Sequence, residues 1–117
     1  MRARTRLFAL DVIDLCLKLG SDDFGRLIRP QLLRAGTGLA ANHRAASRCR
    51  SRREFVAKLS VVIEEADESE LWLDFLETRR YGPPETVSRL RSEAQELRAI
   101  FAASRSTAIE RLRKARQ

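Results

Sequence analysis

The chain has 117 residues, of which 44% are hydrophobic and 33% are charged, and its formal net charge at pH 7 is +7. A chain of this length can bury one hydrophobic core, and its apolar content excludes an intrinsically disordered protein. Only five Gly and three Pro interrupt it, which excludes a many-stranded β-sandwich. We therefore expect one all-α domain over residues 1–117.

The positive charge is carried by arginine, because the 23 basic residues include only three lysines. Arginine presents a planar fork that can hold phosphate or carboxylate with two hydrogen bonds. The bias therefore favours an acidic partner, either nucleic acid or a protein surface rich in carboxylates. A GC-rich genome would produce the same bias without any functional meaning.

The first residues, "MRARTRLFAL", resemble the start of a signal peptide. However, Asp11, Asp14 and Lys18 interrupt the following apolar run at helical spacing, which indicates an amphipathic helix. No segment approaches the ~18 apolar residues that a membrane span needs. Cys16 and Cys49 have neither metal-site spacing nor the number that a disulfide framework requires. We expect a cytoplasmic protein with reduced thiols and no membrane contact.

The first predicted helix covers about residues 5 to 19. Its polar residues form one narrow stripe, and most of its remaining circumference is apolar, which indicates burial on more than one side. That is more apolar surface than a monomeric bundle needs, so the helix predicts contacts between subunits. Gly20 suits the position after this helix, and Ser21 suits the N-cap of the next one.

The second predicted helix runs from about residue 22 to residue 48, and Pro30 is expected to kink it or to mark its true start. A third helix is predicted to begin at Ser51, because Glu54 follows three residues later and completes a capping box. It ends near Tyr81, where the sequence "YGPPE" stops any helix.

The third and fourth helices, the latter starting at Pro84, carry apolar residues in alternating steps of three and four. Long helices separated by short breaks predict an up-down-up-down four-helix bundle. The expected seam of the third helix is Phe55, Leu59, Val62, Ala66, Ser69, Leu73 and Leu76. That of the fourth is Val87, Leu90, Ala94, Leu97, Phe101, Ser104, Ala108 and Leu112.

The stretch "GTGLAANHRAASRCRSRREF", residues 36 to 55, combines glycines, alanines and arginines. It is not a phosphate-binding P-loop, because its glycines stand two apart and no Lys-Ser follows them. Its small residues share one helical face and permit close approach of another helix, either inside the bundle or between subunits. The residues assigned to this oligomer interface are Gly38, Ala41, Asn42 and Ala45.

No catalytic or metal-binding set emerges from the sequence. His43 is the only histidine and is expected at the surface or in an interface, so a di-iron bundle site with its Glu-x-x-His motifs is excluded. The acidic run "EEADESE", residues 64 to 70, is interpreted as a solvated or salt-bridged face. No nucleophile has a convincing base partner. We expect no enzymatic activity, no metal and no cofactor.

Charge is segregated along the chain. Residues 26–58 carry nine basic residues and one acid, whereas residues 59–78 carry seven acids and no base. These two segments could pair, within a subunit or between neighbours. Arginines at the start of the third helix are locally unfavourable there, because the helix dipole disfavours cations. They indicate either a phosphate site or a solvated turn. The residues assigned to nucleic-acid binding are Arg44, Arg48, Arg50, Arg52 and Arg53.

Residues 32–76 resemble the signature of the four-helix-bundle proteins encoded in intervening sequences of bacterial 23S ribosomal RNA genes. The matching elements are "RAGTGLAAN", "SRREF" and "EEADESELWLDFL". That family is similar in fold to the accessory proteins of diversity-generating retroelements, which are basic pentameric barrels that bind a reverse transcriptase and nucleic acid. The resemblance implies a homo-oligomer, a pentamer, with nucleic acid as its partner and no catalytic residues.

Two functional hypotheses remain open. The first is a nucleic-acid-binding accessory module that prefers RNA and contacts phosphate without reading bases. The second is a scaffolding bundle whose basic surface docks an acidic protein such as a reverse transcriptase. In a closed ring, many weak phosphate contacts would act together.

Overall fold

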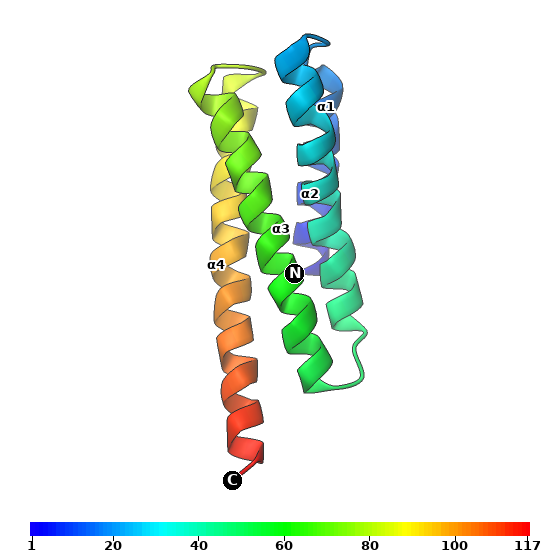
Figure 1. Cartoon of the computed structure of the whole chain (residues 1–117), viewed down its shortest axis with the longest axis vertical. Helices are drawn as coiled ribbons and strands as arrows, with labels where there is room; N and C mark the ends of the chain where they lie inside the picture. Colours follow the sequence, from blue (N-terminus) through cyan, green and yellow to red (C-terminus); the bar gives the residue numbers. More distant parts are fainter.

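The computed structural model describes residues 1–117 as four helices: α1 (Arg2–Lys18), α2 (Asp23–Ser47), α3 (Arg52–Thr78) and α4 (Pro84–Ala115). Consecutive helices run in opposite directions and are joined by short turns (Figure 1). The result is an elongated up-down-up-down bundle of 56 × 23 × 21 Å. The predicted all-α class and architecture are therefore confirmed.

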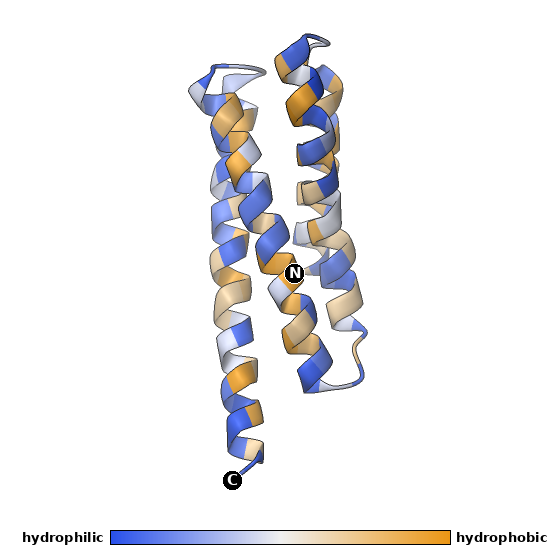
Figure 2. Cartoon of the chain, viewed as in Figure 1, coloured by the Kyte–Doolittle hydropathy of each residue, from blue (hydrophilic) through white to orange (hydrophobic).

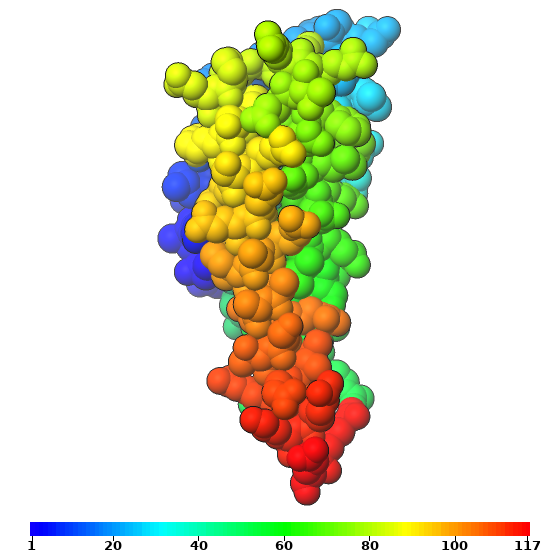
Figure 3. All heavy atoms as spheres, turned by 90° about the vertical axis from the view of Figure 1, so that its left-hand side faces the viewer, coloured from blue at the N-terminus to red at the C-terminus, as the bar shows by residue number.

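The helices differ in length, and this difference positions the candidate site. α1 has 17 residues and α4 has 32. The N-terminus therefore lies part-way along the bundle, and α4 continues past the turn between α2 and α3 (Figure 1). Figure 3 shows the C-terminal residues of α4, in red, projecting beyond the rest of the molecule. At this end of the bundle, α1 does not cover the other three helices.

The core follows the predicted seams. On α3 and α4 the residues Leu59, Val62, Leu73, Leu90 and Leu97 are buried to 1% exposure or less. Hydrophobic and hydrophilic residues alternate along each helix accordingly (Figure 2). Three predicted seam positions differ, because Phe55 and Leu112 are only half-buried and Ser104 is exposed. Ser104 lies on the part of α4 that α1 does not reach.

The junction between α1 and α2 differs from the prediction. Asp22, not Ser21, is the N-cap of α2, and its carboxylate accepts a hydrogen bond from the Gly25 N–H at 2.9 Å. Gly20 does not adopt the left-handed conformation typical of a helix-ending glycine, since Gly82 is the glycine with positive φ. α1 ends instead in extended backbone at Leu19.

Arg29 of α2 caps the end of α1. Its guanidinium donates to the carbonyl oxygens of Cys16 at 3.3 Å and Leu19 at 3.0 Å, and also to that of Gly20. These carbonyls carry the negative end of the α1 dipole, so a cation is favourable there. The sequence does not indicate this contact, because donor and acceptors lie on different helices.

Pro30 does not mark the start of α2, because α2 is one helix from Asp23 to Ser47 with Pro30 inside it. Pro30 is exposed, whereas Ile28 and Leu32 on either side of it are fully buried. Packing of these side chains holds the helix through the residue that lacks a backbone donor.

Candidate nucleic-acid interface

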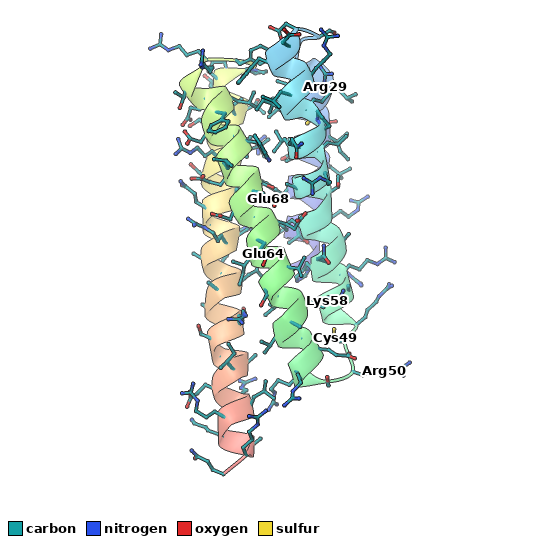
Figure 4. The ribbon with its side chains drawn as sticks, viewed as in Figure 1. Arg29, Cys49, Arg50, Lys58, Glu64 and Glu68 are labelled. Carbon is teal, nitrogen blue, oxygen red and sulfur yellow. The ribbon has the colours of Figure 1, made fainter.

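The arginines that the sequence assigns to nucleic-acid binding surround the turn between α2 and α3. Ser51 caps α3 as predicted, because its hydroxyl accepts a hydrogen bond from the Glu54 N–H at 3.1 Å. The Glu54 carboxylate accepts from the Arg50 N–H at 3.3 Å, one residue before the donor that a full capping box uses. Figure 4 labels Cys49 and Arg50 in this turn, with the Arg50 side chain extending outward.

A groove between α1 and α2 is lined by four arginines; we call it the arginine groove. Arg2 and Arg6 come from α1, Arg44 comes from α2, Arg48 is the C-cap residue of α2, and the groove measures about 410 Å³. Each pair is four residues apart, so its members stand ~6 Å apart along one helix face. Ala40 and Ala41 are among the other lining residues, and their short side chains leave room between the two rows.

A second groove lies between the α2–α3 turn and α4; we call it the loop groove. It measures about 760 Å³ and opens where α4 runs past the end of α1. Its lining combines basic, hydroxyl and apolar side chains. They are Cys49, Arg50, Ser51, Arg52, Phe55, Ser104, Thr107, Ala108 and Arg111.

The arginines of both grooves form no ion pair within the chain, whereas six arginines elsewhere do. Arg4 pairs with Glu93 at 2.6 Å, Arg89 with Asp11 at 3.1 Å, and Arg26 and Arg113 pair with acids of their own helices. Most of the arginines without an ion pair therefore lie toward the end of the bundle where the two grooves are, although Arg79 and Arg80 at the opposite end are also unpaired.

The acidic segment of α3 pairs with α4 rather than with the basic segment of α2, which was one of the expected pairings. Arg91 lies 2.6 Å from Glu77 and 3.5 Å from Glu70, and Arg98 lies 3.2 Å from Asp67. These carboxylates hold the pKa of Arg91 above its ordinary value, and the main cause is the hydrogen bond that Arg91 donates to Glu77. Four of the seven acids in this segment thus pair with arginines of α4, and none of them forms an ion pair with an arginine of α2.

The five arginines that were predicted to bind nucleic acid do not all lie in the same groove. Arg44 and Arg48 lie in the arginine groove, and Arg50 and Arg52 line the loop groove. Arg53 is exposed and lines neither groove, because adjacent residues of a helix point about 100° apart.

Three more arginines line these grooves, although the sequence did not predict them as binding residues: Arg2, Arg6 and Arg111. A signal for the first two was present, since Arg2 and Arg6 repeat at one helical turn just as Arg44 and Arg48 do. Arg111 joins the loop groove only because α4 folds back beside the start of α3, which no local pattern indicates.

The four residues assigned to an oligomer interface lie in different environments in the structure. Gly38 faces the carboxylate of Glu65 on α3, and the Asn42 amide donates to the Gly38 carbonyl at 2.8 Å. Ala41 is exposed in the arginine groove, and Ala45 is half-buried. Gly38 therefore packs inside the bundle, which was one of the two alternatives. The role of this set between subunits stays a prediction.

His43 lies behind the arginine groove. It is half-buried, its ring centroid is 5.2 Å from that of Phe101, and its Nδ1 is 3.5 Å from the Thr5 hydroxyl. Burial lowers the pKa of His43, and the positive charges of the N-terminal amine and of Arg2 lower it further. The neutral imidazole is therefore favoured, and His43 is not a source of positive charge for the groove.

Among the other reactive groups, Cys49 lines the loop groove, whereas Cys16 is buried in the core. No three His, Cys, Asp or Glu side chains lie together in a way that could hold a metal ion. Burial raises the pKa of the Cys16 thiol to about 11, and the Cys49 thiol donates to the Ala45 carbonyl at 3.4 Å. None of the helices has the length and apolarity that crossing a bilayer requires.

Comparisons with known proteins agree with the four-helix fold described above. The family model of the 23S rRNA-intervening sequence proteins matches residues 2–103. A crystal structure of a protein of unknown function from the S23 ribosomal protein family of Bacteroides thetaiotaomicron is similar, with a TM-score of 0.79 and 27% identity. The match covers 87% of this chain and 94% of that one. A search of curated proteins finds no match. The four-helix bundle, the matched signature and the structural neighbour together show that this chain belongs to the 23S rRNA-intervening sequence protein family.

Proposed function

We propose that this chain is a non-enzymatic RNA-binding accessory protein that holds phosphate backbone in the arginine groove. The observation that carries the proposal is the set of four arginines, two from α1 and two from the C-terminal end of α2 and its cap, that line one groove without any carboxylate partner. Unpaired guanidinium groups in two parallel rows suit successive phosphates of a strand, because each can donate two hydrogen bonds to one phosphate.

RNA is favoured over DNA because the family is named for sequences that intervene in 23S rRNA. The lining of the arginine groove contains no aromatic side chain on which a base could stack. Binding there is therefore expected to depend on phosphate and to be independent of base sequence. The family of this chain carries no enzyme name, and the grooves offer no acid–base pair for catalysis.

We further propose that the chain assembles as a homo-oligomeric ring, a pentamer. The support is the apolar surface of α1, where Leu7 is 57%, Leu10 is 40% and Leu17 is 79% exposed. Burial of such side chains between neighbours releases ordered water and favours association. A ring would repeat the arginine groove around one particle, so several weak contacts would hold the same RNA molecule.

A salt titration of RNA binding tests the phosphate proposal. The double variant Arg44→Gln and Arg48→Gln removes two cations from the groove and should bind any single-stranded RNA more weakly. The plot of log affinity against log salt should become less steep by about 1.4, since each phosphate contact contributes about −0.7.

The matched control is Arg79→Gln with Arg80→Gln, which removes the same charge from the exposed turn at the opposite end of the bundle. It should bind as the wild type does. If both double variants weaken binding equally, only net charge matters and the groove is not the site. If the wild type does not bind RNA, the scaffolding alternative replaces this proposal, with an acidic protein docking on the same arginines.

A further inference from the structure

We propose that the loop groove receives the base of one unpaired nucleotide, stacked on Phe55, while the arginines of the groove hold its phosphates. This inference rests on the proposed function and extends it. The arginine groove would hold the backbone of a strand, and the loop groove would hold one nucleotide of that strand with its base turned inward.

The lining of the loop groove matches both parts of a nucleotide. Arg52 and Arg111 face the groove from α3 and α4 and have no ion-pair partner, so they can hold phosphate. Phe55 and Ala108 provide apolar surface on the same two helices. Phe55 is half-buried against the core, so one part of its ring remains available for stacking.

Hydroxyl groups lie between the apolar and the basic surfaces. Ser104 and Thr107 project from α4 into the groove, and Ser104 is exposed although the helical seam places it at a core position. Hydroxyls can donate to or accept from a ribose or a base edge without selecting one base. The groove therefore satisfies a sugar as well as a base and a phosphate.

The size and position of the groove also suit a nucleotide that is part of a strand. Its volume of about 760 Å³ falls within the range of ~300–1,000 Å³ typical of small-molecule sites. Arg48 lines the arginine groove, and Cys49, the next residue, lines the loop groove. A strand that leaves one groove at Arg48 can thus enter the other directly, around the turn where Arg50 extends outward (Figure 4).

An acidic protein segment fits this lining less well than a nucleotide does. Its carboxylates would satisfy Arg52 and Arg111 but would leave the Phe55 ring without a flat partner. An apolar helix would cover Phe55 and Ala108 but would bury unpaired arginine charge at a cost. A nucleotide satisfies both surfaces at once.

The test compares two short single-stranded RNAs that differ only in their bases. One is an oligoadenylate and the other has the same length with abasic residues at its central positions. Fluorescence anisotropy with the full chain should show that the wild type binds the oligoadenylate about tenfold more tightly, as stacking of one base on an aromatic ring predicts.

Phe55→Leu keeps an apolar side chain but removes the aromatic face, so it should lose this preference and bind both RNAs as the wild type binds the abasic one. Phe24→Leu is the matched control, because Phe24 is also half-buried but packs against Tyr81 near the start of α2. It should keep the full preference. Arg52→Gln with Arg111→Gln should weaken binding of both RNAs alike, since it acts on phosphate.

The outcomes separate the two proposals. If the wild type binds both RNAs with equal affinity, RNA binding stands and the nucleotide site is wrong. If Phe55→Leu and Phe24→Leu lower the preference equally, the effect comes from the fold, and the nucleotide site is also wrong. If neither RNA binds, both the proposed function and this inference fail. Thermal melting of each variant shows that the bundle is intact during these measurements.

Discussion

Gly36 of α2 lies directly against Val12 of α1, so that a Cβ atom at position 36 would stand 2.8 Å from Val12 Cγ1 and 3.0 Å from its Cβ. Both residues are buried, and Val12 is branched at Cβ, so neither side can move away easily. Gly36→Ala should therefore lower the free energy of unfolding by about 1–3 kcal/mol, as overpacking of a core does. Urea denaturation measures this loss.

Gly38→Ala is the matched control two residues along the same helix. A Cβ atom there would meet the end of the Glu65 side chain, which is flexible and can turn aside. Alanine also favours a helix over glycine by up to ~1 kcal/mol. This variant should be as stable as the wild type or more stable. Equal losses for both variants would contradict the assignment of the close helix contact to Gly36.

Arg29→Gln should destabilise the bundle by about 1–3 kcal/mol, because it removes charged hydrogen bonds to the last carbonyls of α1. Arg29→Lys should recover only part of the loss, since an ammonium group cannot span several carbonyls in the fixed geometry of a guanidinium. Chemical denaturation of the three proteins gives the comparison.

The control for this cap is Arg26→Gln, which breaks an exposed ion pair with Asp23 on the same helix. Its effect should stay within ~0.5 kcal/mol. A loss at Arg26 as large as that at Arg29 would mean that net charge, rather than capping of α1, stabilises this end of the bundle.

Acid should weaken the link between the start of α2 and the α3–α4 turn. The Tyr81 hydroxyl donates to the Asp22 carboxylate at 2.5 Å, and this bond, followed by the Gly25 N–H, holds the pKa of Asp22 below its ordinary value. A lowered pKa in the folded state stabilises the protein above the unfolded pKa of about 3.9, and this stability is lost as the pH falls through the folded value.

The melting temperature of the wild type should therefore fall more steeply below pH ~4 than that of Asp22→Asn, which cannot titrate. Tyr81→Phe should also reduce the steepness, because it removes the main cause of the lowered pKa. Identical slopes for the wild type and Asp22→Asn in melting experiments from pH 2 to pH 7 would show that this carboxylate contributes nothing to acid sensitivity.

The exposed leucines of α1 predict an oligomer in solution. Light scattering should give the wild type a mass several times that of the 13.4 kDa chain. Leu10→Glu with Leu17→Glu should reduce that mass, because charged side chains would have to be buried between subunits. Leu71→Glu on α3 is the control, since Leu71 is 41% exposed but lies on another helix. A wild type that scatters as a single chain would refute the ring.

The sequence alone determined the helical elements and the buried faces of α3 and α4. Apolar spacing of three and four residues is a local property of a helix, and Ser51, Glu54 and Pro84 mark helix starts within one turn of chain. The sequence also indicated that Arg44, Arg48, Arg50 and Arg52 lie at the same end of the bundle, since they are close in sequence.

Only the tertiary structure decided which charges are free and which groove each arginine lines. Arg91 and Arg98 pair with acids of α3 such as Glu77 and Asp67 because α4 folds antiparallel beside α3, and Arg29 caps α1 across a turn. Arg2 and Arg6 meet Arg44 and Arg48 for the same reason, because α1 and α2 lie side by side in opposite directions. Side-chain periodicity fixes which face of a helix a residue occupies, but ion pairs and grooves depend on the relative register of two helices, which packing of the whole core sets.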